Sequence, residues 1–145
     1  MITISKKLSE YGVKLGNSKN GNGLNASLYH GTFSSEVLPI LSEVENLKEL
    51  VFYVSNISDD DLKGFYILQN VEVLGLLSCY KITDKGIVNL SKMQNLNSLS
   101  VLDTKVSVEG AMALSRALPN LKILGVCSNS TRHTTVNILN EQIIE

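Results

Sequence analysis

The chain has 145 residues, of which 43% are hydrophobic and 19% are charged. This length and composition are typical of a single globular domain, which excludes general disorder. Thirteen Lys and Arg residues against fourteen Asp and Glu residues give a formal net charge of −1. Because the sequence has no basic excess and no dense basic run, we expect no nucleic acid among its partners.

The sequence also argues against a membrane or a metal as partner. No segment approaches the roughly eighteen apolar residues that cross a bilayer, and the first residues lack the apolar run of a secretion signal. We therefore expect a cytoplasmic protein that does not contact a membrane. Cys79 and Cys127 are the only cysteines, too few for a disulfide framework or a four-cysteine zinc site. We expect no cofactor.

Residues 1–23 form the first predicted segment, an N-terminal cap. The stretch GNSKNGNG at 16–23 is rich in Gly and Asn and predicts a flexible loop. The apolar residues before it predict a capping strand or a short hairpin; they are Ile2, Ile4, Val13 and Leu15.

Residues 24–129 repeat with a period of 24 to 25 residues. The clearest units are 47–70, 71–95 and 96–120, each ending in Asn. Each unit opens with an aliphatic residue followed three and five positions later by apolar residues, which predicts a short strand with one buried face. The predicted buried triplets are Leu47/Leu50/Phe52, Val71/Leu74/Leu76, Leu96/Leu99/Val101 and, opening a further unit, Leu121/Leu124/Val126.

A hydroxyl residue follows each predicted strand and predicts a helix N-cap. These residues are Ser34, Ser58, Thr83 and Ser107. The helices are predicted to bury apolar residues at three- and four-residue spacing. These buried sets are Leu62/Phe65/Leu68, Ile87/Leu90/Met93 and Ala111/Leu114/Leu118. Gly86 and Gly110 recur at one register, where the lack of a side chain predicts close packing between units.

Residues 130–145 form the last predicted segment. Val136, Leu139 and Ile143 share one face at helical spacing, which predicts a helix that caps the last repeat. The sequence thus divides into two caps and about four to five repeat units.

The pattern L-x-x-L-x-L-x-x-C/T-x-x-I-T-D-x-G-I-x-x-L in residues 71–90 resembles the leucine-rich repeat. It is similar to the cysteine-containing subtype of F-box and ribonuclease-inhibitor-like proteins, although no F-box helices precede the repeats. The resemblance implies an α/β solenoid, a short curved arc with a parallel sheet on the concave face and helices on the convex face. It implies that Cys79 and Thr104 are buried after their strands, and that the concave face binds another protein. An adaptor role in a ubiquitin-ligase-like complex is one alternative.

The reactive residues form no catalytic motif. His30 and His133 have no Ser, Cys or carboxylate tied to them by a recognisable pattern, so a nucleophilic triad has no basis. The acidic run 59–61 lacks the Asp-x-Asp-x-Asp-Gly loop of a calcium site and is interpreted as a solvated helix start. We therefore expect a protein that is not an enzyme.

Strand positions beside the buried leucines are predicted to form three columns on the concave face. The columns are Tyr29/Tyr53/Leu77/Leu102/Cys127, Ser27/Val51/Gly75/Ser100/Gly125 and Asn25/Glu49/Val73/Ser98/Ile123. Folding does not require apolar residues there, and the predicted apolar patch is at or above the size that monomers usually expose. The predicted partner-binding residues are Tyr29, Glu49, Val51, Tyr53, Val73, Leu77, Ser100, Leu102 and Ile123. A homo-oligomer or a structural subunit of a larger assembly would use the same face.

Overall fold

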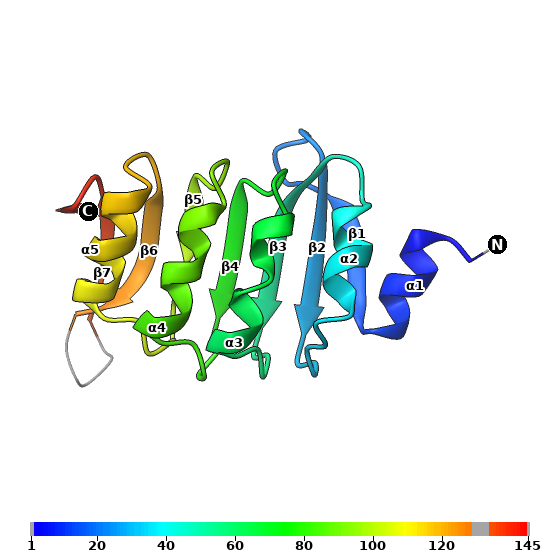
Figure 1. Ribbon diagram of the computed structural model, residues 1–145, viewed down its shortest axis with the longest axis horizontal. Coiled ribbons are helices and arrows are strands. Elements are labelled where there is room, and N and C mark those ends of the chain that lie inside the picture. The colour runs from blue at the N-terminus through cyan, green and yellow to red at the C-terminus, as the bar shows by residue number, and fades with distance from the viewer. Residues whose placement is uncertain (1, 129–133, 145) are drawn as a thin grey trace.

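A single eight-stranded sheet organises the computed structural model, which describes residues 2–128 and 134–144 (Figure 1). The strands are β1 (Val13–Asn17), β2 (Leu24–Tyr29), β3 (Leu47–Tyr53), β4 (Val73–Leu77), β5 (Ser98–Ser100), β6 (Lys122–Cys127), β7 (Thr135–Leu139) and β8 (Gln142–Ile144). They lie side by side in chain order. Strands β2 to β6 are parallel, whereas β1, β7 and β8 pair antiparallel with their neighbours.

Short helices connect the parallel strands. They are α2 (Val37–Ser42), α3 (Asp59–Leu62), α4 (Asp84–Ile87) and α5 (Val108–Ala117), with the 3-10 helices η1 (Phe65–Ile67) after α3 and η2 (Val88–Lys92) after α4. Helix α1 (Ile4–Glu10) precedes β1. Figure 1 shows α2 to α5 on one face of the sheet, α1 beyond β1, and the two termini at opposite ends of the long axis. Within the described residues, none of the helices has both the length and the apolar character needed to cross a membrane.

The predicted fold class is wrong. The sequence predicted a leucine-rich-repeat solenoid, with a parallel sheet on a concave face and a layer of helices on a convex face. The structure is instead one mixed sheet, because three of its strands pair antiparallel. Its helical cover is thin, since α3 and α4 have four residues each and α2 has six.

Turn geometry explains the mixed pairing. The loop from β1 to β2 contains Gly21 and Gly23 at φ values of 71° and 131°, which lets the chain double back. Asn140 and Glu141 join β7 to β8 with φ values of 50° and 59°, a two-residue connection suited to antiparallel neighbours. After one turn of α3 or α4 the chain tightens into η1 or η2, so neither becomes a long helix.

The two terminal segments also differ from the prediction. In the first, Val13 lies in β1 as part of a hairpin with β2, but Ile4 begins a helix. In the last, the described residues 134–144 form strands β7 and β8 rather than a capping helix. Ile138, which the helical pattern did not select, is the fully buried residue there. His133 lies outside the described residues.

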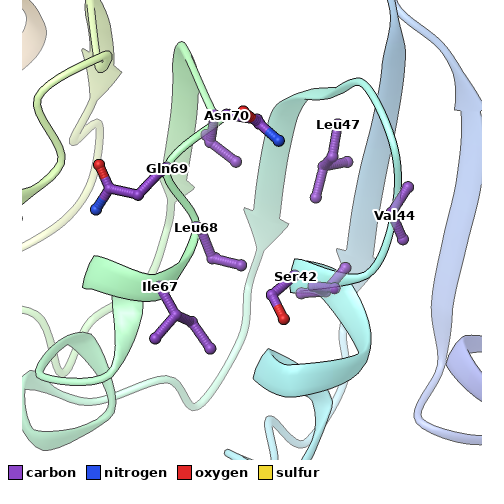
Figure 2. Close-up of a pocket in the computed structure, with 9 residues that line it drawn as sticks. Ser42, Val44, Leu47, Ile67, Leu68, Gln69 and Asn70 are labelled. Carbon is purple, nitrogen blue, oxygen red and sulfur yellow. The ribbon is translucent and has the colours of Figure 1, made fainter.

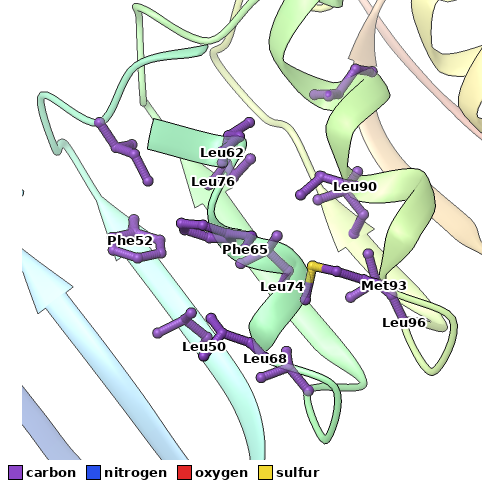
Figure 3. Close-up of a cluster of buried hydrophobic side chains, with 14 of the residues drawn as sticks. Leu50, Phe52, Leu62, Phe65, Leu68, Leu74, Leu76, Leu90, Met93 and Leu96 are labelled. Carbon is purple, nitrogen blue, oxygen red and sulfur yellow. The ribbon is translucent and has the colours of Figure 1, made fainter. Parts of the chain in front are cut away.

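The core lies between the sheet and the helices. Leu50, Leu74 and Leu99 occupy equivalent positions in β3, β4 and β5, and each is at most 1% exposed. Figure 3 shows Phe52 of β3 beside Phe65 of η1, with ring centroids 5.9 Å apart. All nine predicted helical core residues are buried, with at most 6% exposure, so the inward pattern of these segments is confirmed.

Three of the four predicted N-caps are confirmed. Thr83 Oγ1 accepts a hydrogen bond from the Lys85 N–H, and Ser107 Oγ accepts one from the Gly110 N–H, both at 3.2 Å. At Ser58 the backbone N–H donates to Asp61 Oδ2 at 2.8 Å, as in a capping box. The fourth prediction is wrong, because α2 begins after Glu36 without a side-chain cap rather than after Ser34.

Candidate functional site

The sheet face opposite α2 to α5 is the candidate site, and we call it the open face. Strand pairing aligns its side chains into three rows that cross the strands. The edge row is Tyr29, Tyr53, Leu77 and Leu102; the middle row is Ser27, Val51, Gly75, Ser100 and Leu124; the third row is Asn25, Glu49, Val73, Ser98 and Lys122. Eight of the nine predicted partner-binding residues lie in these rows.

The ninth, Ile123, does not lie on the open face. It pairs with Leu99 and is fully buried in the core, so Lys122 and Leu124 take the outward positions instead of Ile123 and Gly125. The physical reason is a bulge in β6. Gly125 has a φ of 75°, and its N–H donates to Asn137 Oδ1 at 3.1 Å, which shifts the strand by one residue. The sequence contains a signal for this shift. The apolar residues Leu121 and Ile123 alternate with outward positions, and Gly125 interrupts that alternation.

Two stacked tyrosines dominate the edge row. The rings of Tyr29 and Tyr53 lie 4.6 Å apart and nearly parallel, at 6°. Tyr29 is 53% exposed, and Leu102 at the other end of the row is 42% exposed. Because parallel strands bring equivalent positions within about 5 Å, the stack follows from the register of β2 and β3.

Backbone contacts fix the spacing of the edge row. The residue after each edge-row residue has positive φ; these are His30, Val54, Ser78 and Asp103, at 50° to 57°. The N–H groups of His30, Val54 and Ser78 donate to the carbonyl oxygens of Tyr53, Leu77 and Leu102, respectively, at 2.8 to 2.9 Å. These backbone hydrogen bonds therefore fix the positions of the edge-row side chains, whether or not a partner is bound.

The middle row varies in side-chain size. A Cβ added at Gly75 would lie 3.0 Å from Val51 Cγ1, so the Val51 side chain already rests against the Gly75 backbone. Ser100 follows Gly75 in this row, and Leu124 follows Ser100. The small residues Gly75 and Ser100 therefore lie between two aliphatic side chains, Val51 and Leu124.

Glu49 in the third row makes an intramolecular contact. Its Oε1 accepts a hydrogen bond from the Ser18 hydroxyl, and Ser18 is only 6% exposed. Ser18 begins the loop that joins β1 to β2. Glu49 thus anchors that loop, a structural role that the sequence prediction of a partner contact did not include.

The reactive residues are not gathered into a catalytic arrangement. Cys79 is fully buried, and this burial raises the pKa of its thiol. Asp59 accepts hydrogen bonds from Thr83, Asp60 pairs with Lys63 at 2.8 Å, and Asp61 caps Ser58. Within residues 2–128 and 134–144, no cluster of three His, Cys, Asp or Glu side chains could hold a metal.

Two hollows lie away from the open face. Figure 2 shows the first, where Ser42, Leu47, Leu68 and Gln69 are among the side chains around a cavity of about 20 Å³ between α2 and η1. This volume is that of a single water molecule. The second, of about 410 Å³, lies between α3 and α4 and is lined by Ser58, Asp59, Asp60, Lys63, Lys81 and Lys85.

Two comparisons with known proteins were negative. No protein-family model matches the sequence, and no curated protein matches it significantly. The resemblance to leucine-rich repeats therefore has no support beyond the residues quoted for it.

Proposed function

We propose that this chain is a non-enzymatic protein-binding module, and that the open face takes the partner. The observation that carries the proposal is the Tyr29–Tyr53 stack at 4.6 Å, on a sheet face that none of the described helices covers (Figure 1). Tyrosine offers a rigid apolar ring with a polar tip and is a frequent anchor at protein interfaces.

The surroundings of the stack support a dry contact. Leu77 and Val51 are partly exposed next to it, Val73 is partly exposed further along β4, and Gly75 and Ser100 add little bulk. Such a surface is apolar and nearly flat, which suits shape-complementary packing against another protein. The fold does not need these outward apolar side chains, because its core is complete on the other side of the sheet.

The burial of Cys79 argues against a catalytic role for its thiol. A thiol acts as a nucleophile through its thiolate, and burial of Cys79 raises its pKa and favours the neutral form. The Cys79 Sγ lies 3.8 Å from the Phe52 carbonyl oxygen, which suits a core residue. We also propose a cytoplasmic location, where a buried reduced thiol is common.

The proposal is tested by charge substitution on the two faces. Leu77→Glu places a carboxylate on the open face, and Val88→Glu makes the same change on η2, where Val88 is 55% exposed. Both purified variants should retain cooperative unfolding. Partners captured from lysate by the wild-type chain are then purified, and their dissociation constants are measured against all three chains.

We expect Leu77→Glu to abolish binding and Val88→Glu to leave it unchanged. A partner that binds Leu77→Glu as tightly as wild type would contradict the proposal. Light scattering on the purified wild-type chain tests the alternative of a homo-oligomer: a dimer that Leu77→Glu converts to a monomer would assign the open face to a second copy.

A further inference from the structure

We propose that the segment bound on the open face is acidic, an extended stretch with apolar anchors and two carboxylates that pair with Lys14 and Lys122. This inference rests on the proposed function, because it names the chemistry of the partner that the open face takes.

The strands carry an unbalanced positive charge. Lys14, Lys48, Glu49 and Lys122 are the charged residues of the eight strands. Lys48 forms an ion pair with Glu72 at 3.1 Å, and Glu49 accepts a hydrogen bond from the Ser18 hydroxyl. Lys14 and Lys122 are exposed and have no ion pair within the described parts of the chain.

Both lysines belong to the open face. Lys14 pairs with Ser27 of the middle row, and Lys122 pairs with Ser98 of the third row. Lys14 lies in β1, beyond the β2 end of the rows, and Lys122 lies in β6, at the other end of the third row. A partner that covered Val51 and Val73 would therefore meet one ammonium group at each flank, and carboxylates at its own flanks would complement them.

Strand spacing sets the distance between the two carboxylates. Five strand intervals separate β1 from β6, which is roughly 24 Å at about 4.8 Å for each interval. An extended chain advances about 3.3 Å for each residue, so this span corresponds to roughly seven residues. Apolar anchors between the two carboxylates would then lie over the middle of the sheet.

The test is a selection from a library of random peptides, each roughly twelve residues long so that it can span the roughly 24 Å between the lysines. The full chain is the target. The most enriched peptide is synthesised, and fluorescence anisotropy gives its dissociation constant for wild type, Ser100→Arg, and the double variant Lys14→Glu/Lys122→Glu. Lys7→Glu/Lys92→Glu is the matched control, with the same charge change on α1 and η2.

We expect enriched peptides with Asp or Glu about seven positions apart around aromatic or aliphatic residues. The double variant should weaken binding about tenfold, and the control should change it less than about twofold. Peptides that Ser100→Arg rejects but that show no acidic preference, or that bind the double variant normally, would overturn this inference and leave the proposed function standing. If no peptide is enriched, or Ser100→Arg binds every peptide normally, the proposed function and this inference both fail.

Discussion

The carboxylate of Asp59 accepts two hydrogen bonds from Thr83, one from its backbone N–H at 2.8 Å and one from its Oγ1 hydroxyl at 2.5 Å. Asp59 begins α3, and Thr83 is the N-cap of α4 in the next unit. The contact recurs one unit later, where Asp84 accepts from the N–H and Oγ of Ser107 at 2.7 and 2.6 Å. These acids therefore join successive helix starts across the molecule.

We predict that Asp59→Ala destabilises the fold by about 2 kcal/mol, because it leaves the Thr83 N–H and hydroxyl without their acceptor. Urea unfolding followed by circular dichroism measures the change. Asp60→Ala is the matched control, since Asp60 is exposed and pairs with Lys63 at the surface. A double-mutant cycle with Thr83→Val should show coupling, and strict additivity of the two single changes would contradict the predicted contact.

The helix-start acids also explain two glycines. A Cβ added at Gly86 would lie 2.2 Å from Asp59 Oδ1, and one added at Gly110 would lie 2.1 Å from Asp84 Oδ1. Both distances are far inside van der Waals contact. The sequence prediction that these glycines allow close packing between units is confirmed, and the group they make room for is the carboxylate of the preceding unit.

We predict that Gly110→Ala destabilises the protein by about 1–3 kcal/mol, although Gly to Ala inside a helix normally stabilises it by about 1 kcal/mol. The clash with Asp84 reverses the sign. In the background of Asp84→Gly, which removes both the carboxylate and the Cβ that would lie 2.8 Å from the added Cβ, Gly110→Ala should again be neutral or stabilising. Thermal unfolding of the four proteins gives the comparison, and an equal loss in both backgrounds would rule out the clash as the cause.

A β-branched residue occupies the left-handed region at the carboxyl end of β3. Val54 has a φ of 50° and is 43% exposed, so it gains little from burial while its branched side chain crowds the backbone. We predict that Val54→Asn stabilises the protein by about 1 kcal/mol, because Asn tolerates this conformation. Val54→Thr keeps the branch and is the control. Chemical denaturation should separate the two variants; equal stability would show that branching has no cost here.

Two periodicities made much of this structure predictable. Alternation fixed the inward faces of β3, β4 and β5, and the three- and four-residue spacing fixed the buried sides of α3 to α5 with their continuations η1 and η2. Both signals involve residues close together in the chain, so they can be recognised in a single sequence. The outward rows of these strands then followed from stacking segments of equal length, as the pairing of Val51 with Gly75 illustrates.

Contacts between distant residues were not predictable in the same way. Asp59 looked like a solvated helix start, because nothing local indicates that Thr83 lies beside it. Ile123 was placed outward because the bulge at Gly125 breaks the alternation of β6. Residues 136–143 suit either a helix or a hairpin by apolar spacing alone, and positive φ at Asn140 and Glu141 decided for the hairpin. The sheet edges, and with them the fold class, depended on such turns.

The burial of Cys79 predicts how stability depends on pH. Because burial raises the pKa of this thiol above its usual value of 9.0, the folded state holds the proton more tightly than the unfolded state. Its contribution to stability is therefore complete below pH 9 and is lost as pH rises through the folded-state pKa. We expect the free energy of unfolding, measured by urea titration from neutral to alkaline pH, to fall as the pH rises from 9 toward the folded-state pKa.

Cys79→Ala removes the titrating group and should flatten this decline, at the cost of a cavity in the core. Thiol labelling gives a second measure in the Cys127→Ser background, where Cys79 is the only thiol. Because Cys79 is 0% exposed, it should react with a disulfide reagent only as fast as the protein opens. Labelling of the native protein at the rate of a free thiol would mean that Cys79 is accessible and titrates as an ordinary cysteine.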